Sequence, residues 1–112
     1  MREAGEQLIR ELLESKVIEE CTSPTPWCSP AFFVKKASGA ARLVTDFRTL
    51  NKAVDRVGWP FPSSDSIRES ILPESKVFFA IDALSGYFQL PIKKEDRKYI
   101  YFITPFGKYM YN

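Results

Sequence analysis

The sequence predicts an α+β fold in which antiparallel strands are combined with short helices. Three observations lead to this class: an amphipathic helical segment near the N-terminus, two hairpin patterns, and an apolar segment typical of a buried strand. Strands and helices in this order, without regular βα alternation, favour α+β domains. The chain has 112 residues, of which 45% are hydrophobic and 14% aromatic, so it suits one small folded domain or a piece of a larger one.

The first two elements are a helix and an extended connector. Leucine and isoleucine recur at helical spacing within EQLIRELLES, which predicts an amphipathic helix over residues 3–15. The segment TSPTPWCSP, residues 22–30, contains three prolines. Because proline lacks a backbone N–H and breaks regular structure, this segment is predicted to be an extended connector.

Two β-hairpins are predicted, with short helical segments between them. The first hairpin pairs AFFVKK with ARLVTDF across a turn at residues 38–39. The second pairs YIYFIT with KYMYN across Pro-Phe-Gly at residues 105–107. Residues 48–54 predict a short helical turn, and residues 64–72 predict a short helix that begins with cap-type residues.

The segment VFFAIDA, residues 77–83, predicts a buried strand with Asp82 at its end. A carboxylate there is costly unless a charged or polar group meets it. Asp82 either caps the following turn, accepting backbone N–H groups of Leu84 or Ser85, or binds a hard cation such as Mg²⁺. The residue pattern alone leaves both interpretations open.

Positive charge is concentrated in the middle of the chain. Residues 1–30 carry 3 basic and 6 acidic side chains, whereas residues 31–60 carry 6 basic and 2 acidic ones. Lys35, Lys36 and Arg42 lie on the two arms of the first predicted hairpin. Such cations either form a solvated surface or bind a phosphate-bearing partner, and three of them near one hairpin tip suit a polyphosphate.

Several classes of chemistry are excluded by composition. The chain has no histidine, which excludes Ser-His or Cys-His nucleophilic catalysis within it and makes a zinc site untenable. Its two cysteines, Cys21 and Cys28, are too few for a disulfide framework and indicate reduced thiols in an intracellular protein. No signal peptide and no 18-residue apolar run is present, so we expect no membrane association.

Four motifs occur in order along the chain. They are SPAFFVKKASGAARLVTDFRTLNK (29–52), WPFP (59–62), FFAIDALSGYFQLPI (78–92) and TPFGKYMYN (104–112). Together they resemble the reverse transcriptase domain of retroviral and gypsy-type LTR-retrotransposon Pol polyproteins, from about residue 8 to the end of the chain.

This resemblance implies the fingers and the N-terminal half of the palm of a right-hand polymerase. Residues 1–21 would be an N-terminal helix leading into the fingers, residues 22–56 the fingers with the basic hairpin, and residues 57–112 the start of the palm with the first catalytic aspartate motif. The implied activity is RNA-directed DNA polymerisation, in which dNTPs are added to an RNA or DNA template-primer with two Mg²⁺ ions.

The resemblance also implies partners and a location. The remaining palm, the thumb and the RNase H region of a Pol polyprotein would accompany this chain, in the cytoplasm or in a virus-like particle, without a membrane partner.

By this resemblance, the motif around residue 82 contains most residues of the polymerase active site. Asp82 matches the first catalytic aspartate of the family and would bind the metal ions, with the carbonyl of Ala83 as a further ligand. Ser85 and Gly86 match the positions where backbone amides approach the triphosphate. Tyr87 matches the steric gate, whose ring would clash with a 2′-hydroxyl and so favour deoxynucleotides.

The basic hairpin implies the rest of the site. Lys36 and Arg42 match residues of the fingers that contact the incoming triphosphate. Lys35 precedes the matched lysine and Gln89 follows the gate, so both are expected nearby without a defined role. In the segment TDFR, the opposite charges of Asp46 and Arg48 predict an internal ion pair or hydrogen-bond network and no catalytic role.

The second aspartate motif of the family, Y-x-D-D, is absent from these residues. Because one carboxylate does not hold two Mg²⁺ ions, we expect the 112-residue chain alone to be inactive. Two alternatives remain open: a truncated or domesticated, non-catalytic retroelement remnant that binds nucleic acid or nothing, and a small soluble interaction module.

Overall fold

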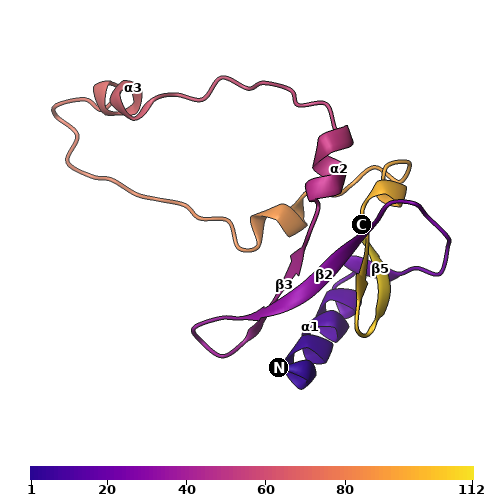
Figure 1. Cartoon of the computed structure of the whole chain (residues 1–112). Coiled ribbons are helices and arrows are strands. Elements are labelled where there is room, and N and C mark those ends of the chain that lie inside the picture. The colour runs from indigo at the N-terminus through magenta and orange to yellow at the C-terminus, as the bar shows by residue number, and fades with distance from the viewer.

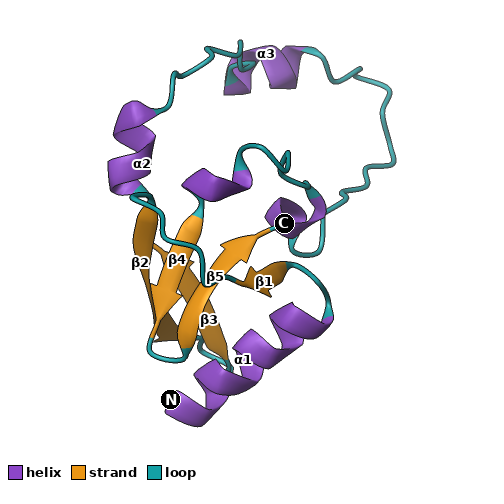
Figure 2. Ribbon diagram, turned by 90° about the vertical axis from the view of Figure 1, so that its right-hand side faces the viewer, coloured by secondary structure: helices purple, strands orange, loops and turns teal.

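A mixed five-stranded sheet forms the centre of the computed structural model, which describes all 112 residues. The strands are β1 (Ile18–Glu20), β2 (Cys28–Lys35), β3 (Ala41–Thr45), β4 (Tyr101–Thr104) and β5 (Gly107–Tyr111). Their order across the sheet is β1-β5-β4-β2-β3 (Figure 2). The β2–β3 and β4–β5 pairs are the two predicted hairpins, which the structure confirms.

The predicted antiparallel pairing is found in three of the four strand pairs, and the fourth pair differs. Three pairings are antiparallel, but β2 and β4 run parallel, with Ser29 opposite Phe102. A hairpin pattern defines only the pairing within that hairpin. The two hairpins dock side by side so that Ser29 and Phe102 are both buried, and this orientation makes their shared pairing parallel.

Helix α1 (Arg2–Glu14) confirms the predicted N-terminal helix and packs along one face of the sheet (Figure 2). Gly5 allows this close approach, because a Cβ atom at this position would lie 3.1 Å from the ring of Phe33 on β2. The helix buries Ile9 and Leu12 against the sheet. The core cluster consists of Ile9, Leu12, Ile18, Phe102 and Tyr109.

The chain leaves α1 by a tight reversal that leads directly into the sheet. Lys16 adopts the left-handed conformation with φ 57°, its N–H donates to the carbonyl of Leu13, and the N–H of Val17 donates to the carbonyl of Leu12. These two bonds satisfy carbonyl groups at the C-terminus of the helix, the arrangement known as a Schellman motif. The reversal places Val17 beside the sheet immediately before β1.

The remaining helices are short. Helix α2 (Arg48–Ala53) and helix α3 (Ser64–Glu69) confirm the two predicted segments, and the Ser63 hydroxyl accepts the N–H of Ser66 at the start of α3. Two 3-10 helices follow, η1 (Gly86–Gln89) and η2 (Arg97–Tyr99). No helix is long and apolar enough to cross a membrane.

Residues 54–85 form a long excursion away from the sheet, with α3 near its far end (Figure 1). Every residue of this excursion is exposed. The radius of gyration is 18.6 Å, whereas a compact domain of this length has roughly 13 Å. The sheet and α1 therefore form a small packed body from which this segment projects.

The predicted buried strand over residues 77–83 is wrong, because this segment is neither a strand nor buried. It lies in the excursion without regular structure, and Phe79 and Ile81 are 87% and 88% exposed. A strand requires a neighbour to pair its backbone groups, and no segment of the chain lies beside it. An apolar sequence pattern indicates that these side chains favour burial, but it does not show which segment would pair with them.

Candidate nucleotide site between the hairpin, helix α1 and η1

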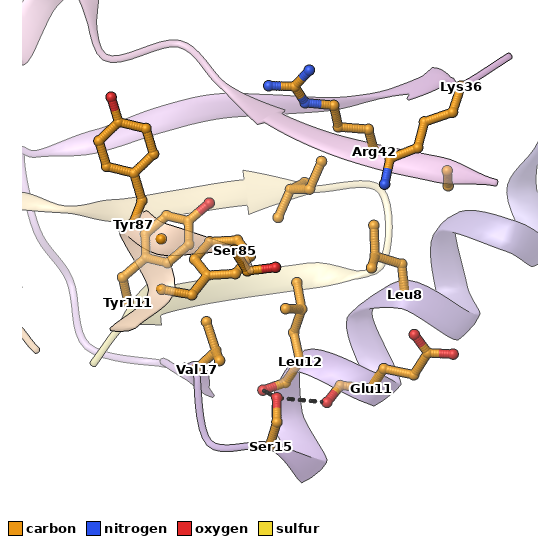
Figure 3. Close-up of a pocket in the computed structure, with 14 residues that line it drawn as sticks. Leu8, Glu11, Leu12, Ser15, Val17, Lys36, Arg42, Ser85, Tyr87 and Tyr111 are labelled. Carbon is orange, nitrogen blue, oxygen red and sulfur yellow. Dashed lines mark hydrogen bonds between the residues drawn. The ribbon is translucent and has the colours of Figure 1, made fainter. Parts of the chain in front are cut away.

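A cavity of about 780 Å³ lies between α1, the β2–β3 hairpin and η1 (Figure 3). Its 14 lining residues come from segments that are far apart in the sequence. The five residues predicted to bind the incoming dNTP are among them: Lys36, Arg42, Ser85, Gly86 and Tyr87. The fold thus brings the basic hairpin and the residues that follow Asp82 to one opening, which is called the hairpin cavity below.

The hairpin turn places its two cations on one wall of the cavity. The N–H of Lys36 donates to the carbonyl of Ala40 at 2.8 Å, and the N–H of Gly39 donates back to the carbonyl of Lys36 at 2.9 Å. Gly39 has φ +87°, which favours glycine at this position of the turn. Lys36 and Arg42 are both exposed and unpaired in the structure, so their charges are free to meet an anion.

Lys35 does not line the cavity. It is the last residue of β2, and successive side chains along a strand point to opposite faces. This alternation separates the side chain of Lys35 from that of Lys36.

Helix α1 forms the opposite wall. The apolar side chains of Leu8 and Leu12 face the cavity, and Glu11 and Ser15 lie beside them (Figure 3). The Ser15 hydroxyl donates to the carbonyl of Glu11 at 2.9 Å and therefore caps the last turn of the helix. Glu11 is the only acidic side chain among the lining residues.

The third wall is the tight turn that leads into η1. Ser85 has φ 49° and ψ 49°, a left-handed conformation that costs an L-residue roughly 1–2 kcal/mol. The carbonyl of Ser85 accepts the N–H of Phe88 at 2.9 Å, which closes the turn. The Tyr87 ring is 92% exposed at the rim of the cavity, whereas the next ring, Phe88, stacks against Tyr111 of β5.

Tyr111 contacts two of the walls, the hairpin strand β3 and η1. Its ring lies 4.7 Å from Phe102 and 6.2 Å from both Phe47 and Phe88, measured between ring centroids. Its hydroxyl lies 3.0 Å from the hydroxyl of Thr45 on β3. Burial raises the pKa of Tyr111, while the hydrogen bond to Thr45 acts in the opposite direction, so the phenol is neutral at physiological pH.

Sequence reasoning missed Phe88, Tyr111 and Glu11 as parts of this site. Phe88 directly follows the matched Tyr87 and has no role implied by the resemblance, and Tyr109 and Tyr111 alternate within KYMYN, which predicts a strand. That alternation, which puts both tyrosines on one face, was the available signal for an aromatic contact there. Nothing local in the α1 sequence singles out Glu11, because its position depends on how the helix docks.

Asp82 and Ala83 do not line the hairpin cavity. Both are exposed, and no salt bridge of the structure involves Asp82. The residue that precedes η1 as its N-cap is Ser85, so Asp82 lies outside the first turn. The Asp82 carboxylate is therefore solvated, and its charge needs no buried partner.

The acidic side chains of the chain do not form a metal centre by themselves. No group of three or more Asp, Glu, Cys or His residues is positioned to hold a metal ion. Two Mg²⁺ ions need several oxygen ligands, so Asp82 and the Ala83 carbonyl do not fit that pair of ions without further ligands.

Two further predicted residues have structural contacts. Gln89 does not line the cavity, and its side-chain amide donates to the carbonyl of Leu84 at 2.6 Å, which braces the turn before η1. Asp46 and Arg48 form the predicted ion pair, with Arg48 Nη2 2.6 Å from Asp46 Oδ2. The Arg48 side chain and its backbone N–H lower the pKa of Asp46 from 3.8 to about 2.

A second, smaller cavity of about 470 Å³ adjoins η1. It is mostly apolar, and Tyr87, Phe88 and Tyr111 line both cavities. The short helix η1 therefore borders both cavities, and Phe88 of η1 contacts Tyr111 of β5.

Known proteins with similar sequences are viral polyproteins, while no family model matches the chain. The chain is 32% identical over 115 residues to the enzymatic polyprotein of Cauliflower mosaic virus (strain Strasbourg), covering 99% of the chain and 16% of that protein. It is 33% identical over 102 residues to the Gag-Pro-Pol polyprotein of Mason-Pfizer monkey virus, covering 91% of the chain and 6% of that protein.

Solved structures give the same picture for the fold. The foamy viral protease-reverse transcriptase in complex with dsDNA matches 99% of the chain with a TM-score of 0.78 and 23% identity, and the match covers 23% of that structure. The chain is thus homologous to one part of viral enzymatic and Gag-Pro-Pol polyproteins, and it has the fold of a part of a viral protease-reverse transcriptase. The comparisons therefore confirm that the chain resembles viral polyproteins, as the sequence motifs predicted.

Proposed function

We propose that this chain is part of an RNA-directed DNA polymerase of the reverse transcriptase type, and that the hairpin cavity receives the triphosphate of the incoming dNTP. The observation that carries the proposal is the meeting of Lys36 and Arg42 with Ser85, Gly86 and Tyr87 around one cavity. These residues belong to two separate sequence motifs that lie more than forty positions apart along the chain.

The side chains suit this task chemically. Lys36 offers a point charge, and Arg42 offers a planar fork of donors that matches phosphate oxygens. The turn at Ser85 and Gly86 exposes backbone at the cavity wall, where its N–H groups would approach the same oxygens. The exposed ring of Tyr87 would lie beneath the sugar and reject a 2′-hydroxyl by its bulk.

We further propose that residues 1–21 and 22–56 belong to the fingers and that residues 57–112 begin the palm. The central sheet takes strands from all three ranges, since β1 pairs with β5 and β2 pairs with β4. On this proposal the fingers and the start of the palm share one sheet, which fixes the basic hairpin relative to η1.

In the proposed enzyme, Asp82 and the Ala83 carbonyl would supply part of a Mg²⁺ site. When bound, the metal ions would stabilise the charge that develops on the reacting oxygens. These two residues do not hold the ions alone, so the site would need carboxylates from outside residues 1–112. The exposure of Asp82 leaves its carboxylate free to take part.

The template-primer and the other polyprotein regions are the proposed macromolecular partners. One of the structures that share this fold is a viral protease-reverse transcriptase in complex with dsDNA. The relatives are much longer polyproteins, of which the chain spans 16% in the case of Cauliflower mosaic virus. We propose that the remaining palm, the thumb and an RNase H region complete the enzyme around this chain.

A second candidate function is a non-catalytic remnant that binds nucleic acid. Two observations favour it: Asp82 has no acidic neighbour in a metal-binding group, and the apolar segment 77–83 has no strand beside it. The two candidates differ in the role of Asp82, because only the polymerase requires its charge.

Grafting distinguishes these candidates. Residues 1–112 replace the matching part of the foamy virus protease-reverse transcriptase, and dNTP incorporation on a template-primer is measured. The polymerase proposal predicts incorporation by the chimera and its loss in Asp82→Asn, which keeps the shape of the side chain but removes its charge. The control Asp65→Asn, which alters an exposed carboxylate on α3, should retain activity. An active chimera in which both variants perform alike would overturn the role of Asp82.

A further inference from the structure

Glu11 lies on the α1 wall of the hairpin cavity, across from the two cations of the hairpin (Figure 3). Its carboxylate accepts a hydrogen bond from the Gln7 amide at 3.1 Å and is exposed to solvent. It is in no salt bridge, so its charge is not compensated by a paired cation. The formal charge of the cavity wall is thus +1, from Lys36 and Arg42 against Glu11.

An uncompensated carboxylate in an anion-binding cavity weakens the binding of anions. The repulsion grows in proportion to the charge of the ligand, and it is screened over roughly 10 Å at 0.1 M salt. A triphosphate carries several negative charges, so it meets a larger penalty than a monophosphate. Neighbouring Leu8 and Leu12 offer no charge that would offset this repulsion.

We propose that Glu11 sets the affinity of the hairpin cavity for polyphosphates by opposing Lys36 and Arg42. This inference rests on the proposed function of the cavity as a triphosphate site. Glu11 is a specificity-determining residue in this account: it limits the binding of highly charged free polyphosphates. Helix α1 thereby contributes to ligand selection, in addition to packing against the sheet.

The chain provides a matched control on the same helix. Glu14 is also exposed and lies one turn later, but it does not line the cavity. Both residues lie in the C-terminal half of α1, where removing a negative charge reduces the unfavourable interaction with the helix dipole. Glu11→Gln keeps an oxygen that accepts the bond from Gln7, so the substitution removes the charge and preserves this contact.

The test is calorimetric titration of the full 112-residue chain with inorganic tripolyphosphate, with circular dichroism to verify folding. Glu11→Gln should tighten binding about two- to tenfold at low salt, and less at about 0.2 M salt, because the repulsion is screened. Glu14→Gln should bind like the wild type. Equal tightening by both variants, or none by Glu11→Gln, overturns the role of Glu11.

Lys36→Ala separates this inference from the proposed function. If Lys36→Ala weakens binding and Glu11→Gln does not change it, the triphosphate site stands and the Glu11 inference fails. If tripolyphosphate does not bind the wild type, or binds Lys36→Ala equally well, the proposed site itself fails. Glu11→Lys offers a second variant, which should tighten binding more than Glu11→Gln.

Discussion

The ring of Phe88 stacks on the ring of Tyr111, with centroids 6.2 Å apart and an interplanar angle of 25°. This contact fastens η1, which carries the Tyr87 side of the candidate site, to the last strand of the sheet. The segment before η1 projects into solvent, so Phe88 is a main attachment of this wall to the packed body. This aromatic pair therefore helps to hold the η1 wall of the hairpin cavity in place.

Removing this attachment should disrupt the site more than the fold. Phe88→Ala loses an aromatic pair that is worth about 0.5–1.5 kcal/mol, and Ser85 to Tyr87 would then move away from the hairpin. We expect affinity for dTTP to fall by up to about tenfold, while the thermal transition of the sheet changes little. Phe79→Ala, at an exposed position of the excursion, is the control and should bind normally. Unchanged affinity in Phe88→Ala would show that η1 is held by other contacts.

Tyr87 should control the choice between deoxyribonucleotides and ribonucleotides. In the foamy virus chimera, Tyr87→Val should admit ribonucleotides, because a smaller side chain relieves the clash with a 2′-hydroxyl. The ratio of kcat/KM for dTTP to that for UTP measures this effect. Tyr99→Val, at a surface tyrosine that does not line the cavity, is the control. If the ratio does not change, Tyr87 is not a steric gate.

The Asp46–Arg48 pair predicts a stability difference that depends on pH. The pKa of Asp46 is about 2 in the fold against an ordinary value of 3.8. The carboxylate therefore stabilises the fold above pH 3.8, and this contribution is lost as the pH falls from 3.8 through about 2. Arg48→Ala removes the guanidinium and keeps the backbone N–H that also binds Asp46.

Thermal melts of the wild type and Arg48→Ala measure this difference. The wild type should have the higher Tm at pH 5–7, and the gap should shrink below pH 4 and close near pH 2. The effect should amount to a few degrees at most, because the pair is largely solvent-exposed. Arg68→Ala, which removes a longer exposed contact of 3.9 Å to Asp65, should show no such pH dependence. A Tm difference that stays constant from pH 6 to pH 2 would show that it does not come from the ionised Asp46 carboxylate.

Local features of the fold could be predicted from the sequence. The spacing of apolar residues predicted α1, and the turn residues predicted both hairpins, because each of these signals concerns residues that contact one another within a short stretch. The ion pair of Asp46 and Arg48 is local in the same sense.

Features that depend on distant contacts could not be predicted in this way. The parallel pairing of β2 with β4 joins residues about seventy positions apart, and no local pattern encodes its direction. Residues 77–83 have the composition of a strand, but pairing requires a neighbour that local sequence cannot reveal. In the candidate site, Lys36, Arg42, Ser85, Gly86 and Tyr87 line the cavity, while Asp82 and Ala83 do not. Glu11 and Tyr111 join the cavity only through the docking of α1 and β5, which no local pattern encodes.

The most direct test of the central claim is an NMR titration of the 112-residue chain with dTTP. If the hairpin cavity binds the triphosphate, saturable shift changes should appear at the backbone amides of Lys36, Arg42, Ser85 and Gly86, and Arg42→Ala should weaken the binding at least tenfold, since a charge-assisted hydrogen bond contributes about 1.5–3 kcal/mol. Shift changes scattered over other surfaces, or an Arg42→Ala variant that binds dTTP as the wild type does, would contradict the account.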